Sequence, residues 1–109
     1  MNTPLDWDFV DDAKADITEI GLYFAERDRN VEDRFYQALD KTVRVLCRSP
    51  NIGERCHFRN PRTKGMRMWL ISGFSNYLIF YRVQGNILQI LRVIHGARDN
   101  AAMFDGEHS

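Results

Sequence analysis

The sequence predicts a single α+β domain over residues 1–109: an N-terminal strand, an antiparallel two-helix hairpin, then a three-stranded antiparallel sheet (β-α-α-β-β-β). Two observations carry this prediction. Apolar residues recur at helical spacing in the first half, whereas runs rich in β-branched and aromatic residues, separated by turn residues, fill residues 66–95. A chain of 109 residues is long enough to bury a core without disulfides or metal ions.

The start of the chain predicts one strand followed by one helix. In "LDWDF" (5–9) leucine, tryptophan and phenylalanine alternate with aspartate, which is the pattern of a short, half-buried edge strand. Asp11 and Asp12 follow, and an aspartate there suits the N-cap of a helix. The helix itself is indicated by apolar residues three or four positions apart: Ala13, Ile17, Ile20 and Phe24.

A second helix is predicted after the charged segment "AERDRN" (25–30). Its stripe consists of Val31, Phe35, Leu39, Val43 (or Thr42) and Leu46. The helix should end at Ser49-Pro50, because proline disfavours the helical conformation of the residue before it. Two amphipathic helices with a short link are expected to pack as an antiparallel hairpin. Residues 49–65 then form a long polar loop, which is a kind of segment that is usually functional or mobile.

The second half predicts strands over residues 66–71, 77–83 and 87–95. Gly85 and Asn86 tolerate positive φ and suit a tight turn, which sets Gln84 opposite Ile87. In this register Leu78, Phe80, Leu91 and Val93 share one face, and Ile79, Tyr81, Val83, Leu88, Ile90 and Ile94 share the other. Both faces are apolar, yet one helical hairpin covers only one. We expect the tail, a partner or a second copy of the chain to cover the other.

Charge is distributed unevenly, although the formal net charge is zero. Residues 1–40 hold eleven acidic and four basic residues, whereas residues 41–99 hold eleven basic and two acidic ones. The basic half either meets nucleic acid or an acidic protein, or is neutralised by the acidic half within the fold.

Location is predicted from what the sequence lacks. No apolar run reaches the roughly 18 residues that a membrane span needs. The segment "MNTPLDWDF" (1–9) has neither the basic nor the apolar region of a signal peptide. We therefore expect a cytoplasmic protein in which Cys47 and Cys56 are reduced thiols.

No motif for metal binding, nucleotide binding or nucleophilic catalysis occurs. Cys47, Cys56 and His57 do not have the spacing of zinc ligands, and the glycine-rich phosphate loops and G-x-S-x-G are missing. The sequence "IHGARD" (94–99) brings histidine, arginine and aspartate together, but neither a nucleophile nor a second base accompanies them. The sequence predicts no catalytic residue, no metal site and no cofactor.

The arginines and aromatic residues of the second half are more informative. A guanidinium group suits phosphate or carboxylate, so Arg82 and Arg92 either bind such a ligand or pair with helix acids such as Asp16 or Glu19. Four aromatic residues either stack on nucleic-acid bases or, as is commoner at strand spacing, belong to the core or to a protein interface: Trp69, Phe74, Tyr77 and Tyr81.

Three segments, taken in order, resemble the RelE/ParE superfamily and within it the ParE-type toxins of bacterial type II toxin–antitoxin modules. They are "AKADITEIGLYF" (13–24), "RFYQALDKTVRVLCRSPNIGER" (34–55) and "GMRMWLISGFSNYLIFYRVQGNILQILRVIHGARD" (65–99). The last is the most specific, because it is similar to the family's G-x-R strand, Y-x-I-x-Y-R strand and I-L-R-V-x-H-G-x-R-D ending. The resemblance implies a RelE/ParE-like fold in which residues 97–109 form a short C-terminal tail.

The resemblance implies one of two toxic activities. ParE-like members act on DNA gyrase and block replication, whereas RelE-like members bind the ribosomal A site and cleave mRNA. The nucleases use an arginine past the last strand and, six residues later, a tyrosine. Arg98 stands at the arginine position here, but Phe104 has no hydroxyl to bond phosphate or move a proton. We expect a gyrase inhibitor rather than an enzyme. The alternatives are a ribosome-dependent mRNA endonuclease and a module that has lost toxicity.

The resemblance also implies partners and contact residues. The partners are DNA gyrase and a ParD-like ribbon-helix-helix antitoxin in a hetero-oligomer, with no membrane association and no sequence-specific DNA binding by this chain. The antitoxin's C-terminal segment is expected to lie along the helical hairpin and the sheet and to cover the second apolar face. The predicted antitoxin contacts are Phe24, Tyr36, Trp69 and Phe74, and the predicted gyrase contacts are Arg67, His95, Arg98, Asp99 and Phe104.

Overall fold

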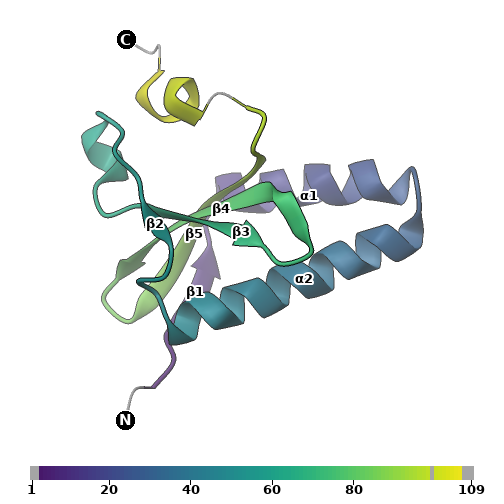
Figure 1. The fold of residues 1–109 in the computed structure, drawn as a ribbon, viewed down its shortest axis with the longest axis horizontal. Coiled ribbons are helices and arrows are strands. Elements are labelled where there is room, and N and C mark those ends of the chain that lie inside the picture. Colours follow the sequence, from purple (N-terminus) through teal and green to yellow (C-terminus); the bar gives the residue numbers. More distant parts are fainter. Residues whose placement is uncertain (1–2, 99, 107–109) are drawn as a thin grey trace.

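The computed structural model describes residues 3–98 and 100–106. Its elements are β1 (Asp6–Phe9), α1 (Asp11–Ala25), α2 (Arg29–Arg48), β2 (Glu54–Arg55), η1 (Pro61–Thr63), β3 (Arg67–Ile71), β4 (Phe74–Gln84), β5 (Ile87–His95) and η2 (Ala102–Gly106). The strands form one sheet in the order β1-β5-β4-β3-β2, and the helical hairpin packs on one face of it (Figure 1). The predicted α+β fold is confirmed, with β2 and the short helical segments η1 and η2 added.

The sheet has five strands rather than three and is mixed rather than purely antiparallel. β1 pairs in parallel with β5, with Asp6 opposite Ile87. At the other edge, β2 pairs with Arg67 and Met68 at the start of β3. Within the described residues, the remainder of β3 has no strand partner on that side.

The two helices begin in different ways. Val10, not an aspartate, occupies the N-cap of α1, because its N–H donates to the carbonyl of Ile90 and so continues the β1–β5 pairing. The prediction that Asp11 or Asp12 caps this helix is therefore wrong. Both lie in its first turn, where a carboxylate interacts favourably with the helix dipole. α2 has a side-chain cap, since Asp28 accepts the N–H of Asn30 at 2.8 Å.

The larger core lies between the helices and the sheet face that they cover, which we call the helix-side face. Its fully buried side chains include Phe35, Leu46, Ile79, Tyr81 and Ile90. The predicted apolar stripes of both helices point into it, except Val31, as do alternate residues of β4 and β5. The prediction of which strand residues share this face is confirmed for Ile79, Tyr81, Leu88 and Ile90.

A β-bulge within β5 shifts the strand pairing by one residue from the predicted register. Gln84 lies opposite Ile87, as predicted, and Gly85 takes a φ of 61° in the turn. Further along, Tyr81 pairs with Ile90 but Phe80 pairs with Arg92, so β5 contains one extra residue. Val93 therefore packs in the helix-side core and Ile94 in the opposite cluster, the reverse of the prediction.

The opposite face of the sheet, the tail-side face, is covered by the chain itself. Its buried residues are Met66, Leu78, Phe80 and Ile94, and the side chains packed on them include Cys56, Phe58, Met103 and Phe104. Of the three predicted covers, the chain's tail is confirmed, together with part of the 49–65 segment. That an antitoxin segment also lies on this face stays a prediction, and the chain's own residues cover part of the face.

Hydrogen bonds, which we call the tail clasp, attach the C-terminal segment. The Asp105 carboxylate accepts the backbone N–H groups of Arg59 at 2.9 Å and Asn60 at 2.8 Å. The side-chain amide of Asn60 donates to the Phe104 carbonyl at 2.9 Å. η2 is thereby placed beside the η1 region (Figure 1). Among the described residues, no helix is long and apolar enough to cross a membrane.

Candidate functional site

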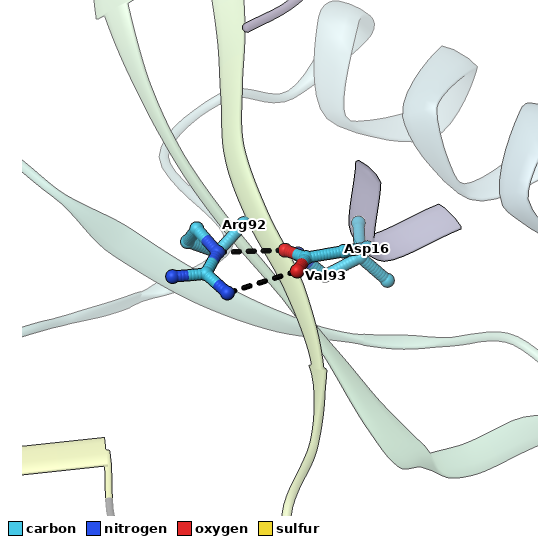
Figure 2. Close-up of polar contacts among 3 residues, drawn as sticks. All are labelled: Asp16, Arg92 and Val93. Atoms are coloured by element: carbon cyan, nitrogen blue, oxygen red, sulfur yellow. Dashed lines mark hydrogen bonds and ion pairs between the residues drawn. The ribbon is translucent and has the colours of Figure 1, made fainter. Parts of the chain in front are cut away.

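A buried carboxylate joins α1 to β5 (Figure 2). Asp16, only 7% exposed, accepts hydrogen bonds from Arg92 Nε at 2.7 Å and Nη2 at 2.8 Å, and from the Val93 N–H at 3.0 Å. The side-chain hydrogen bond to Asp16 is the main reason that the pKa of Arg92 is raised above its ordinary value. Pairing with a helix acid is thus confirmed for Arg92, which holds the two layers together.

Arg82 behaves differently. Its Nη1 donates to the carbonyl of Arg62 at 2.7 Å, and no carboxylate of the described residues lies within ion-pair distance of it. Pairing with Asp16 or Glu19 is therefore wrong for Arg82. The physical reason is position: Arg82 lies near the far end of β4, beside the η1 segment, whereas the Asp16 carboxylate is already saturated by Arg92 and Val93.

The structure divides the predicted gyrase contacts among separate places. His95 ends β5, where its Nδ1 accepts the Ala97 N–H at 3.0 Å and its ring meets the edge of Tyr77. Arg98 is exposed and borders a cavity of about 160 Å³ together with Asp16 and residues of α1. Asp99 lies outside the described residues.

Phe104 lies on the other side of the sheet from Arg98. Its ring stacks on Phe58 with a centroid distance of 4.9 Å and also contacts Phe80, within the tail-side cluster. Arg67, at the start of β3, donates from Nη1 to the Gly53 carbonyl at 2.8 Å. It pairs with Tyr81 near the far end of β4, and so lies at the opposite end of the sheet from Arg98. The described members of the predicted set therefore do not form one site.

Three of the four predicted antitoxin contacts are neighbours. Phe24 at the end of α1, Phe35 of α2, and Phe74 and Tyr77 of β4 form a cluster with ring-centroid distances between 5.4 and 5.8 Å. Tyr36 contacts the ring of Phe35 and covers Gly21 of α1. Beside the cluster, a cavity of about 350 Å³ is lined by Phe24, Phe74 and the β3–β4 turn. Aromatic side chains thus border an accessible hollow.

Trp69 belongs to a second apolar patch. It is 37% exposed and lies on β3 next to Leu70, which is 48% exposed, in the part of the strand that β2 does not pair. With Ile52, Met68 and Leu78 they line a cavity of about 270 Å³. Within the described chain, no ring contact connects Trp69 with the aromatic cluster.

Neither cysteine is a candidate nucleophile. Burial raises the pKa of Cys56 to about 11 and also raises the pKa of Cys47. Both thiols are consequently protonated near neutral pH, and both are free. The described residues contain no cluster of metal-ligating side chains either.

Sequence reasoning missed the tail clasp. Asn60 did carry a signal, because asparagine before proline favours a helix cap, and its side chain does accept the Arg62 N–H. Asp105 carried none, since its partners are backbone N–H groups 45 and 46 residues away. Those two N–H groups lower the pKa of the Asp105 carboxyl, the one from Arg59 most.

Comparison with known proteins finds a matching family model and similar solved structures. The family model described as the ParE toxin of the type II toxin–antitoxin system parDE matches residues 8–100. A solved chain from the chromosomal ParDE TA system of P. aeruginosa is similar to this one, with a TM-score of 0.67 and 21% sequence identity over 84% of this chain and 95% of that chain. At this identity the structural likeness concerns the fold. No curated protein sequence matches significantly.

Proposed function

Since the chain belongs to the ParE toxin family of type II toxin–antitoxin systems, we propose that it stops replication by inhibiting DNA gyrase. A ParD-like antitoxin neutralises it by direct binding in a hetero-oligomer. The chain acts in the cytoplasm, where gyrase is found, and works as an inhibitor rather than as an enzyme. It does not read DNA sequence itself.

The observation that carries this proposal is the separation of Arg98 and Phe104. A nuclease of the superfamily needs a hydroxyl to act beside the arginine, whereas here the corresponding ring is apolar and packed against Phe58 and Phe80 on the tail-side face. Arg98 borders a cavity against α1 on the helix side. The two groups therefore cannot act on one phosphate in this arrangement, which favours gyrase inhibition over mRNA cleavage.

The antitoxin-binding surface follows from the two exposed apolar patches. The aromatic cluster around Phe24 and Phe74 borders one cavity, and the Trp69–Leu70 patch borders the other. Exposed aromatic residues beside a concave surface are typical of protein interfaces. An amphipathic antitoxin segment would place apolar side chains in these hollows and its acidic residues against the basic half of the chain.

Expression of the chain without its antitoxin tests the function. A gyrase inhibitor should arrest DNA synthesis first and produce filamentous cells, and the purified chain should inhibit supercoiling by purified gyrase. Unimpaired supercoiling at saturating protein would contradict the proposal. A harmless phenotype together with retained antitoxin binding would indicate a module that has lost toxicity.

The alternative, a ribosome-dependent mRNA endonuclease, makes a separate prediction. Primer extension on translated mRNA should then reveal new cuts, and Arg98→Ala should abolish them. Arg34→Ala is the matched control, because Arg34 is also exposed but lies on α2. If no cut appears while DNA synthesis stops, the endonuclease is excluded.

A further inference from the structure

A cavity of about 210 Å³ at the β2 edge of the sheet gathers three arginines from three strands. Arg55 comes from β2, Arg67 from the start of β3 and Arg82 from near the end of β4. Its other walls are the loop after α2, at Pro50 and Asn51, and the turn before β3. No acidic residue lines the cavity.

These three guanidinium groups have no anionic partner within the described residues. The described residues form two ion pairs, Asp40–Arg44 and Asp16–Arg92, and neither involves a residue of the cavity. Glu54 lines the neighbouring cavity that contains Trp69. Three like charges around one small hollow repel one another, so an anion placed between them would be strongly favoured.

Two of the three arginines, Arg67 and Arg82, are held in place by backbone carbonyl oxygens and keep further donors free. Arg67 uses only Nη1, toward the carbonyls of Gly53 at 2.8 Å and Asn51 at 3.3 Å. Arg82 uses Nη1 toward Arg62, and its Nε is buried with no hydrogen-bond partner in the described part of the chain. A buried donor without an acceptor costs free energy. The Nη groups of both residues that make no hydrogen bond are the donors left for a bound oxyanion.

Hydrogen bonds of the Tyr81 hydroxyl hold one wall of the cavity in place. The Tyr81 side chain is fully buried, its hydroxyl donates to the Pro50 carbonyl at 2.7 Å, and it accepts the Gly53 N–H at 3.0 Å. This fixes the loop that supplies the acceptors of Arg67. A side chain at Gly53 would collide with the Tyr81 hydroxyl, so the position requires glycine.

We propose that the cavity between Arg55, Arg67 and Arg82 binds a phosphate group, either of a free nucleotide or of a nucleic-acid backbone. Guanidinium groups arriving from three strands suit a tetrahedral phosphate, whose oxygens point in several directions, better than a planar carboxylate. The cavity has about seven times the ~30 Å³ that one water occupies in the liquid, which is enough for a phosphate. Tyr81 is the aromatic residue that lines the cavity, and its buried ring cannot stack on a base, so recognition at this cavity is independent of sequence.

Calorimetric titration of the full chain with inorganic phosphate tests the site. We expect one phosphate per chain and a roughly tenfold weaker Kd in Arg55→Ala, which corresponds to the loss of one charge-assisted contact. Arg55 is exposed and its side chain makes no hydrogen bond in the described structure, so this variant keeps the fold. Arg34→Ala on α2 is the control and should change the Kd less than twofold. Equal weakening in both variants, or no binding at millimolar phosphate, would overturn the proposal.

Further titrations in 0.15 M salt distinguish the sources of phosphate. Binding of a 12-residue oligothymidylate that needs Arg55 and is displaced by inorganic phosphate identifies a nucleic-acid backbone. Binding of a 5′-mononucleotide, without binding of the oligothymidylate, identifies a free nucleotide. A glutamate-rich peptide that binds more tightly than phosphate through Arg55 would overturn the proposal in favour of an acidic protein partner. None of these measurements involves gyrase, so they succeed or fail independently of the proposed toxicity.

Discussion

The two faces of the sheet are both covered, but by unequal means. On the helix-side face, α1 and α2 contribute 15 and 20 residues, and their buried side chains form one core with the strands. On the tail-side face, four buried strand-side residues meet a few side chains of residues 56–58 and 103–104. The buried Asp16–Arg92 pair holds the helices on the sheet. The tail clasp, whose hydrogen bonds come from exposed and half-buried backbone, holds the tail-side cover.

This difference indicates which part of the molecule can open without unfolding. Local opening requires little energy where few apolar contacts and solvent-accessible hydrogen bonds hold a segment. The tail-side cover meets this description, whereas removal of the helices would expose the main core. Phe104, a predicted gyrase contact, lies in the cover that can open. Its side chain could therefore become exposed while the rest of the domain stays folded.

The largest expected effect comes from emptying the helix-side core. Phe35→Ala should lower the free energy of unfolding by about 3–5 kcal/mol, because a fully buried ring that contacts Phe24, Phe74 and Tyr77 is replaced by a cavity. Urea unfolding followed by circular dichroism measures the change. Phe35→Leu, which keeps most of the volume, should lose less than half as much. An unfolding free energy that hardly changes would mean that this core is not what holds the helices.

The next effect comes from breaking the tie between the layers. Asp16→Ala should lower the free energy of unfolding by about 3 kcal/mol, because the Arg92 guanidinium and the Val93 N–H lose their acceptor in a mostly buried place. Thermal unfolding provides the measurement. Asp33→Ala, at an exposed position of α2, is the matched control and should stay within about 0.5 kcal/mol of the parent.

A double variant sharpens this second comparison. In Asp16→Ala with Arg92→Leu, both partners are replaced, so no guanidinium group is left without its acceptor. Part of the loss should be recovered relative to the single Asp16→Ala variant. If the double variant is as unstable as the sum of the single variants, the pair does not act as a unit.

The tail-side cover should respond more weakly. Phe104→Ala should lower the free energy of unfolding by about 1.5 kcal/mol, since its ring is only half-buried and meets Phe58 and Phe80 alone among the aromatic residues described. Amide hydrogen exchange should rise in residues 58–63 and 100–106 while the helices stay protected. A uniform rise across the domain would show that the two covers open together.

The same contrast explains how much the sequence predicts. Periodic apolar residues predicted both helices, four of the five strands and most of the helix-side core, because burial against one partner surface imposes a regular spacing. The bulge that exchanges Val93 and Ile94 breaks that spacing by one residue and leaves no local mark. Parallel pairing of β1 with β5 depends on residues about 80 positions apart, which a local pattern cannot reveal.

For the candidate sites, the sequence identified residue types better than groupings. Phe24, Tyr36 and Phe74 do gather at one end of the hairpin, because two helical stripes and a strand end there. The predicted gyrase contacts do not gather, since η2 packs Phe104 on the tail-side face, whereas Arg98, just past β5, borders the cavity against α1. The arginine cavity brings together side chains of three strands beside the loop around Gly53. Residues this far apart in the sequence become neighbours only in the folded chain.

The smallest expected effect concerns the tail clasp and is a pH dependence. The N–H groups of Arg59 and Asn60 lower the pKa of Asp105 in the folded chain, so the clasp stabilises the tail at pH values above the ordinary carboxyl pKa. This stabilisation is lost as the pH falls through the lowered pKa, because the protonated carboxyl accepts hydrogen bonds poorly. NMR titration should therefore give a midpoint for Asp105 below that of an aspartate in an unfolded peptide, and the amide shifts of Arg59 and Asn60 should move with the same midpoint.

Asp105→Asn is the matched variant for this titration, because it keeps the size of the side chain and one oxygen acceptor but removes the charge. The amide shifts of Arg59 and Asn60 should then no longer follow that midpoint, and exchange in the tail should be faster than in the parent at neutral pH. The helices should be unaffected, since the buried Asp16–Arg92 pair holds them. An ordinary midpoint for Asp105 in the parent would mean that the clasp is open in solution. The tail would then be held on this face without the clasp, by packing contacts such as those of Phe104 and Met103.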